Sequence, residues 1–119
     1  MSAADHIFGA IEKGDVEGVR AVYATDAVIW HNFDEVEQSV EDNLRVLGWM
    51  AGTFSERRYE VVFRKEWDEG FVQQHVLHLT KRDGTTIALP ACIVARVADG
   101  KITRIDEYLD SAQAARLAG

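Results

Sequence analysis

The hydrophobic positions in the first part of the chain repeat with the spacing of an α-helix. Ile7, Phe8 and Ile11 share one helical face, with Ser2 as a start signal and Gly14 as a stop signal. Asp15 then caps a second short helix, whose apolar positions are Val16, Val19, Val22 and Tyr23. The pattern predicts two helices packed through these faces.

A strand-like run at residues 27–32 follows the second helix. Asp34 and Glu37 have the spacing of a capping box, which predicts that a third helix begins there. Its apolar positions are Val36, Val40, Leu44 and Leu47. The acidic residues between 34 and 42 would form its solvated face rather than a metal site.

The second half of the chain has the pattern of an antiparallel meander. The predicted strands cover residues 58–67, 71–82, 85–97 and 101–108. They are separated by Asp68-Glu69-Gly70 and by two Asp-Gly pairs, Asp83-Gly84 and Asp99-Gly100, which are strong hairpin signals. Residues 111–118 could add a last helical turn or two. Helices followed by a long-stranded sheet predict an α+β fold, with a curved sheet and a cleft between the two layers.

Composition narrows the class of protein. The chain has 119 residues, which suits one domain over residues 1–119, and its net charge is -7. That charge argues against nucleic acid and anionic membrane surfaces as partners. Cys92 is the only cysteine, so no internal disulfide can form, and no apolar run is long enough to cross a membrane. We therefore expect a soluble, cytoplasmic protein.

Two stretches of the sequence resemble a known family. Residues 23–32, Tyr-Ala-Thr-Asp-Ala-Val-Ile-Trp-His-Asn, are similar to the helix-to-strand passage of SnoaL-like proteins. Residues 99–110, Asp-Gly-Lys-Ile-Thr-Arg-Ile-Asp-Glu-Tyr-Leu-Asp, are similar to their last strand. These proteins belong to the nuclear transport factor two-like superfamily, with ketosteroid isomerases, polyketide cyclases and limonene epoxide hydrolases. The resemblance implies a cone: a strongly curved, antiparallel or mixed sheet wrapped around N-terminal helices, with an internal apolar pocket. It also implies a homodimer that pairs through the outer face of the sheet.

The resemblance also places two candidate catalytic residues. His31 falls where ketosteroid isomerases and several cyclases carry a carboxylate base, and Glu107 falls where epoxide hydrolases carry one catalytic aspartate. Position 31 is His rather than Asp, and residues 71–80 contain no Arg-x-Asp. The two specific activities are therefore not predicted. His31 could act as an acid or base, or could tie down a loop.

Strand alternation adds a third candidate, His75. It shares a face with Gln73, Leu77 and Leu79, whereas His78 points to the other face, so the two histidines cannot share a metal ion. His75 could equally lie on an exterior or dimer face. Glu107 could orient either His31 or His75. No metal site is predicted.

Several bulky or polar residues are candidates for the ligand pocket. They are Trp30, Phe33, Trp49, Met50, Phe54, Phe63, Asp106 and Tyr108. Most of the aromatic residues will be core, but some could form a wall for a flat apolar ligand. Trp49 and Met50 end the third helix, where the mouth of the cone would lie. Regular alternation would put Asp106 and Tyr108 on the face opposite to Glu107.

Three functions are compatible with these features. The first is a cofactor-independent enzyme that isomerises, cyclises, dehydrates or hydrates a small apolar molecule, with His31 as acid or base and with His75 and Glu107 orienting or donating. The second is a pocket protein that binds a small ligand without catalysis. The third is a dimerisation module whose pocket is filled by its own side chains.

Overall fold

The computed structural model describes residues 2–118. Its helices are α1 (Ala3–Lys13), α2 (Val16–Val22), α3 (Val40–Thr53) and α4 (Ser111–Ala114), followed by a 3-10 turn, η1 (Ala115–Ala118). Its strands are β1 (Tyr23–His31), β2 (Glu37–Gln38), β3 (Phe54–Trp67), β4 (Gly70–Lys81), β5 (Thr86–Ala98) and β6 (Lys101–Leu109). None of the helices in this part of the chain is long and apolar enough to cross a membrane. The predicted α+β class is confirmed.

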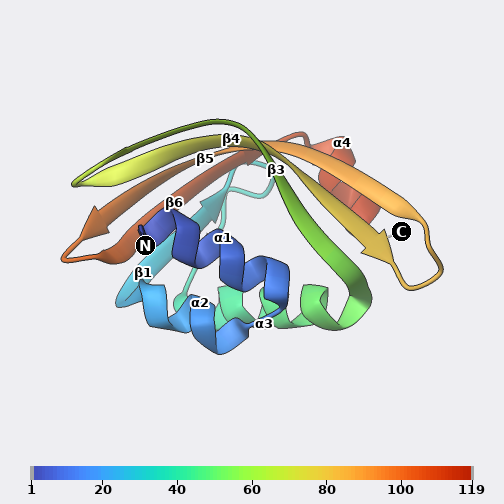
Figure 1. The fold of residues 1–119 in the computed structure, drawn as a ribbon, viewed down its shortest axis with the longest axis horizontal. Coiled ribbons are helices and arrows are strands. Elements are labelled where there is room, and N and C mark those ends of the chain that lie inside the picture. The colour runs from blue at the N-terminus through green and yellow to red at the C-terminus, as the bar shows by residue number, and fades with distance from the viewer. Residues whose placement is uncertain (1, 119) are drawn as a thin grey trace.

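The strands of the described residues form one mixed sheet that curves over the helices. The strand order is β2-β1-β6-β5-β4-β3, and only the β1–β6 pair is parallel. Figure 1 shows the sheet arching over α1, α2 and α3, which all lie on its concave side. Because β3, β4 and β5 are 12 to 14 residues long, they must twist and bend, and this bend makes the concave surface.

Local signals set most element ends as predicted. The Ser2 hydroxyl accepts a hydrogen bond from the backbone N–H of Asp5, and Gly14 ends α1 with a left-handed φ of 71°. Asp15 caps α2 by accepting from the N–H of Gly18. Asp99 and Gly100 both have positive φ, as a two-residue type I′ hairpin requires.

Three predicted boundaries were wrong, and one of them is the start of β3, which lies at Phe54 and not at residue 58. The third helix begins at Val40, because the Ser39 side chain accepts from the N–H of Asp42 and so caps it. Asp34 instead accepts from the N–H of Val36 in the β1–β2 loop, and Glu37 belongs to β2. Tyr23 is not the last residue of α2 but the first of β1, with extended backbone angles.

The core consists of two groups of buried side chains under the sheet. The larger one joins α1, α2 and the start of α3 to β1, β4, β5 and β6, and includes Ile7, Phe8 and Ile105. The smaller one joins the end of α3 to β3, β4 and β5 around Met50 and Phe54. Leu47 and Tyr59 pack against both groups.

The outer, convex face of the sheet is also apolar in places. Val94 on β5 is paired with Val72 on β4 and with Asp106 on β6, and paired residues share a face of the sheet. Phe63, Val94 and Tyr108 are exposed on this side, and the rings of Trp30 and Tyr108 meet edge to face at 5.4 Å.

Candidate functional site

A cavity of about 340 Å³ lies between the helices and the concave side of the sheet. Most of its wall is apolar and comes from both core groups and the C-terminal segment. These side chains include Ile7, Phe8, Ile11, Phe33, Leu47, Met50, Leu77, Leu89, Ile93, Ile105 and Leu117. A cavity of this size and lining suits a small apolar organic molecule.

A few polar groups interrupt this wall. They are Tyr23, His31, Asp34, Gln38, Asn43, Tyr59 and Glu107. A small number of placed polar groups in an apolar pocket is what fixes the orientation of a ligand.

His31 and Glu107 form the ion-pair contact of the cavity. They are register partners at the end of the parallel β1–β6 pair, and the Nε2 atom of His31 lies 2.9 Å from Oε1 of Glu107. Asn32 forms two hydrogen bonds between the ends of the same two strands. Its N–H donates to the Glu107 carbonyl, and its Oδ1 accepts from the N–H of Leu109. Parallel pairing therefore holds the imidazole and the carboxylate side by side on the concave face.

The surroundings of His31 favour its protonated form. Burial lowers the pKa of the imidazole, but the hydrogen bond to Glu107 and the negative charges of Glu107 and Asp34 outweigh it, so the pKa lies above its usual 6.5. The side chains of His31 and Glu107 are 14% and 23% exposed, so solvent screens the pair only in part.

The remaining polar atoms of the pair, Nδ1 of His31 and Oε2 of Glu107, differ in whether a ligand in the cavity can reach them. Nδ1 of His31 is buried and has no hydrogen-bond partner. No described residue donates a hydrogen bond to Oε2 of Glu107, and Glu107 lines the cavity. The accessible basic atom of the pair is therefore a carboxylate oxygen, with the imidazole behind it.

Two tyrosines provide further polar atoms in the wall. The Tyr23 hydroxyl donates to Oδ1 of Asn43 at 2.7 Å, and the Asn43 amide donates to Gln38. The Tyr59 hydroxyl has no hydrogen-bond partner among the described residues. Burial raises the pKa of both phenols, so both remain protonated donors at neutral pH.

His75 lies behind the cavity wall. It is 1% exposed, does not line the cavity, and stacks edge to face against Tyr59 and Phe8 at 4.8 and 5.6 Å. Its Nδ1 atom lies 2.8 Å from the amide nitrogen of Gln73, and the Gln73 oxygen accepts from Nε of Arg64 at 2.7 Å.

The direction of these bonds fixes the tautomer of His75. Arg64 can only donate, so the atom of Gln73 facing it is the oxygen, and the amide nitrogen must face His75. His75 Nδ1 is then an acceptor, and the ring proton sits on Nε2, which is buried without a partner. Burial lowers the pKa of His75. The negative charge of Glu107 raises it and the positive charge of Arg64 lowers it further, but burial is the largest effect, so the ring stays neutral.

The structure brings together some of the residues predicted from the sequence and separates others. His31, Glu107, Phe33 and Met50 line the cavity, and Trp49 lines a groove outside it. Five predicted ligand contacts do not line the cavity: Trp30, Phe54, Phe63, Asp106 and Tyr108.

The physical reasons for these five differ. Trp30, Asp106 and Tyr108 alternate with inward residues, so they face out from the sheet. Phe63 also faces out, because a bulge between Val61 and Phe63 reverses the alternation of β3. Phe54 is fully buried in the core where α3 meets β3.

Several lining residues were not predicted. Tyr59 is the inward register partner of Leu77, so the alternation of β4 extended across the hairpin could have found it. No pattern in the sequence pointed to three others, Tyr23, Gln38 and Asn43. The placement of β2 and of the start of β1 depends on tertiary contacts. Within residues 2–118, no group of three or more His, Cys, Asp or Glu side chains is placed to hold a metal ion.

Comparisons with known proteins agree with this architecture. The family model described as the SnoaL-like domain matches residues 4–105. No curated protein sequence matches the chain. Among solved structures, an NTF2-like protein of unknown function from Burkholderia pseudomallei K96243 is 19% identical, with a TM-score of 0.79 over 97% of this chain and 93% of that one.

Two further solved structures have the same fold. IdmH from Streptomyces antibioticus, a proposed polyketide cyclase, is 19% identical, with a TM-score of 0.80 over 98% of this chain and 96% of that one. TerC, co-crystallised with polyporic acid, is 18% identical, with a TM-score of 0.78 over 97% and 94%. At these identities the likeness concerns the fold alone.

Proposed function

The chain belongs to the SnoaL-like domain family, and we propose that it binds a small apolar carbonyl compound in the cavity and moves a proton on it without a cofactor. The observation that carries this proposal is the His31–Glu107 pair, a carboxylate and an imidazole 2.9 Å apart in an otherwise apolar wall. Acid–base chemistry needs a titratable group within reach of the ligand, and this pair supplies one.

Glu107 is the group that would take the proton. With its Oε1 held by His31, its Oε2 can remove a proton from a carbon next to the ligand carbonyl. The electron pair of the broken C–H bond then moves to the carbonyl oxygen and gives an enolate. His31, in its protonated form, donates from Nε2 to Oε1 and holds the carboxylate in place, and the transferred proton stays on Oε2 until it is returned to the ligand.

Tyr59 would stabilise the enolate oxygen. Its hydroxyl lies in the cavity wall, remains protonated and has no partner in the described structure. Return of the proton to a different carbon completes an isomerisation. Attack of the enolate carbon on a second carbonyl of the same ligand completes a cyclisation instead, with the proton going to the new hydroxyl.

The second candidate function is ligand binding without turnover. The observation that favours it is the predominance of apolar side chains around a single ion pair, with His31 Nδ1 closed off from the cavity. The crystal of TerC with polyporic acid supports a ring-containing ligand for either function.

The two functions are separated by isotope exchange in an apolar ketone. 2-Tetralone has acidic protons next to its carbonyl, and their replacement by deuterium in heavy water can be followed by NMR. If the chain is an enzyme of the proposed kind, it will bind 2-tetralone and accelerate the exchange. Binding without acceleration would favour the second function, and absence of binding would contradict both.

A further inference from the structure

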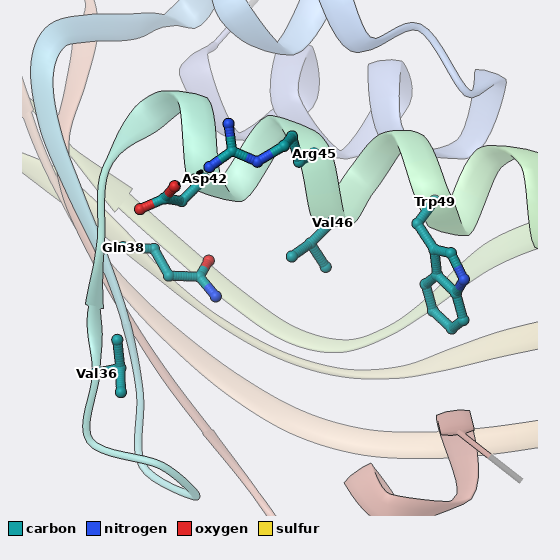
Figure 2. A pocket seen from close by; sticks show the side chains of 6 residues that line it. All are labelled: Val36, Gln38, Asp42, Arg45, Val46 and Trp49. Atoms are coloured by element: carbon teal, nitrogen blue, oxygen red, sulfur yellow. Dashed lines mark hydrogen bonds and ion pairs between the residues drawn. The ribbon is translucent and has the colours of Figure 1, made fainter.

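An open groove shares part of its wall with the cavity. It has a volume of about 450 Å³ and is lined by Val36, Gln38, Asp42, Arg45, Val46 and Trp49. Gln38 and Val46 also line the inner cavity, so the two spaces meet at these two side chains. Figure 2 shows Val46 and Trp49 projecting from α3 to the same side, with Gln38 on β2 facing them.

Four exposed apolar side chains line this groove or the inner cavity. Phe33 and Val36 come from the β1–β2 hairpin, and Val46 and Trp49 come from α3, and all four are exposed. Phe33 also lines the inner cavity and lies 5.3 Å from the His31 ring. Exposed apolar side chains that cluster on one rim indicate a binding surface rather than ordinary surface variation.

The charges of the groove cancel. Arg45 forms an ion pair with Asp42 one helical turn before it, so the two charges of the groove lie side by side and have opposite signs. Trp49 is held by edge-to-face contact with Phe54, with ring centres 5.9 Å apart. The groove therefore offers a neutral, apolar strip with one fixed indole.

We infer that the ligand of the cavity is elongated: a compact, ring-containing part lies beside His31 and Glu107, and an uncharged apolar extension passes between Gln38 and Val46 and lies along Trp49. This inference rests on the proposed function, because it assigns the groove to the same ligand. The two spaces share Gln38 and Val46 in their walls, which favours one ligand that spans both over a second molecule.

A series of naphthols tests the inference. 2-Naphthol is small enough to lie within the inner cavity, whereas the longer 6-alkyl-2-naphthols carry a tail that can reach the groove. Calorimetric affinities should rise with each methylene that reaches the groove, by up to about fourfold per methylene. A tail of the same length ending in a carboxylate should gain less, because the carboxylate would lose hydration beside the apolar side chains of the groove.

Substitution of Trp49 makes the test specific. Trp49→Ala should remove most of the gain from the tail while leaving the affinity for 2-naphthol unchanged, and Trp49→Phe should keep part of the gain. Trp67→Ala is the matched control: Trp67 and Trp49 are 48% and 47% exposed, but Trp67 lines neither space. Thermal unfolding of each variant verifies that it is folded.

The outcomes distinguish the two proposals. If 2-naphthol binds but the alkyl tail adds nothing, or if Trp49→Ala does not reduce the gain, the elongated ligand is wrong and the proposed function stands. If 2-naphthol and its alkyl derivatives all fail to bind, both the elongated ligand and the proposed function are wrong.

Discussion

Nε2 of His31 lies 2.9 Å from Oε1 of Glu107, across the only parallel strand pair in the described sheet. In a parallel pair the register partners come from distant parts of the sequence, and here 76 positions separate them. The contact depends on the fold being complete, and it puts both groups in the cavity wall.

The first prediction concerns the pKa of His31. Replacing Glu107 by Gln removes the negative charge that favours the imidazolium, so the pKa of His31 should fall. An NMR titration of the histidine ring signals measures it. Glu60→Gln is the matched control, because Glu60 forms a similar 2.7 Å contact with His78 on the outer face and should leave the pKa of His31 in place. An unchanged pKa in Glu107→Gln would show that the pair is not coupled.

The second prediction concerns stability against pH. The pKa of His31 is raised in the folded state, so its pair with Glu107 contributes stability that is fully present below pH 6.5. This contribution is lost as the pH rises through the raised folded-state pKa. Glu107→Gln should therefore lower the free energy of unfolding by roughly 1 kcal/mol at pH 5.5 and by less at pH 8.5. Urea unfolding at both pH values measures this, and an effect that grows with pH would contradict it.

Much of the fold follows from local signals in the sequence. Ser2, Gly14 and Asp15 end or begin helices, and the Asp-Gly pairs close hairpins, because each of these effects acts within a few residues. The two-residue strand β2 and the cap at Ser39 could not be predicted in this way. Glu37 and Gln38 form a strand only because β1 offers an edge beside them.

The site was predictable where strand alternation is regular. Alternation of β6 brings Glu107 inward with Ile105, and alternation of β4 brings His75 inward with Leu77. Phe63 was a candidate for its bulk alone, and the bulge that turns it outward is not visible in a pattern of apolar residues. Alternation also could not show that Tyr59 and Phe8 come between His75 and the cavity.

The third prediction concerns the tautomer of His75. The bonds from Arg64 through Gln73 require a neutral ring with its proton on Nε2. The ¹⁵N shifts of the ring should show a protonated Nε2 and an unprotonated Nδ1 at pH 6.5, where an ordinary histidine would be half charged. An imidazolium, or a proton on Nδ1, would overturn the assignment of the Gln73 amide.

The fourth prediction concerns assembly. We propose that the apolar outer face of the sheet, with Phe63, Val94 and Tyr108 exposed on it, pairs with a second copy of the chain. Val94→Asp would place a second carboxylate next to Asp106, its register partner, and should shift the protein from dimer to monomer. Sedimentation of the wild type and the variant measures this. A wild type that is monomeric at micromolar concentration would remove the proposal.

The most direct test of the account compares the rate of deuterium exchange at the α-carbon of saturating 2-tetralone between the wild type, Glu107→Gln and Glu60→Gln. The wild type and Glu60→Gln should accelerate the exchange equally, whereas Glu107→Gln should bind the ketone and lose about a hundredfold or more of the acceleration. Equal exchange rates in the wild type and Glu107→Gln would contradict the assignment of Glu107 as the base.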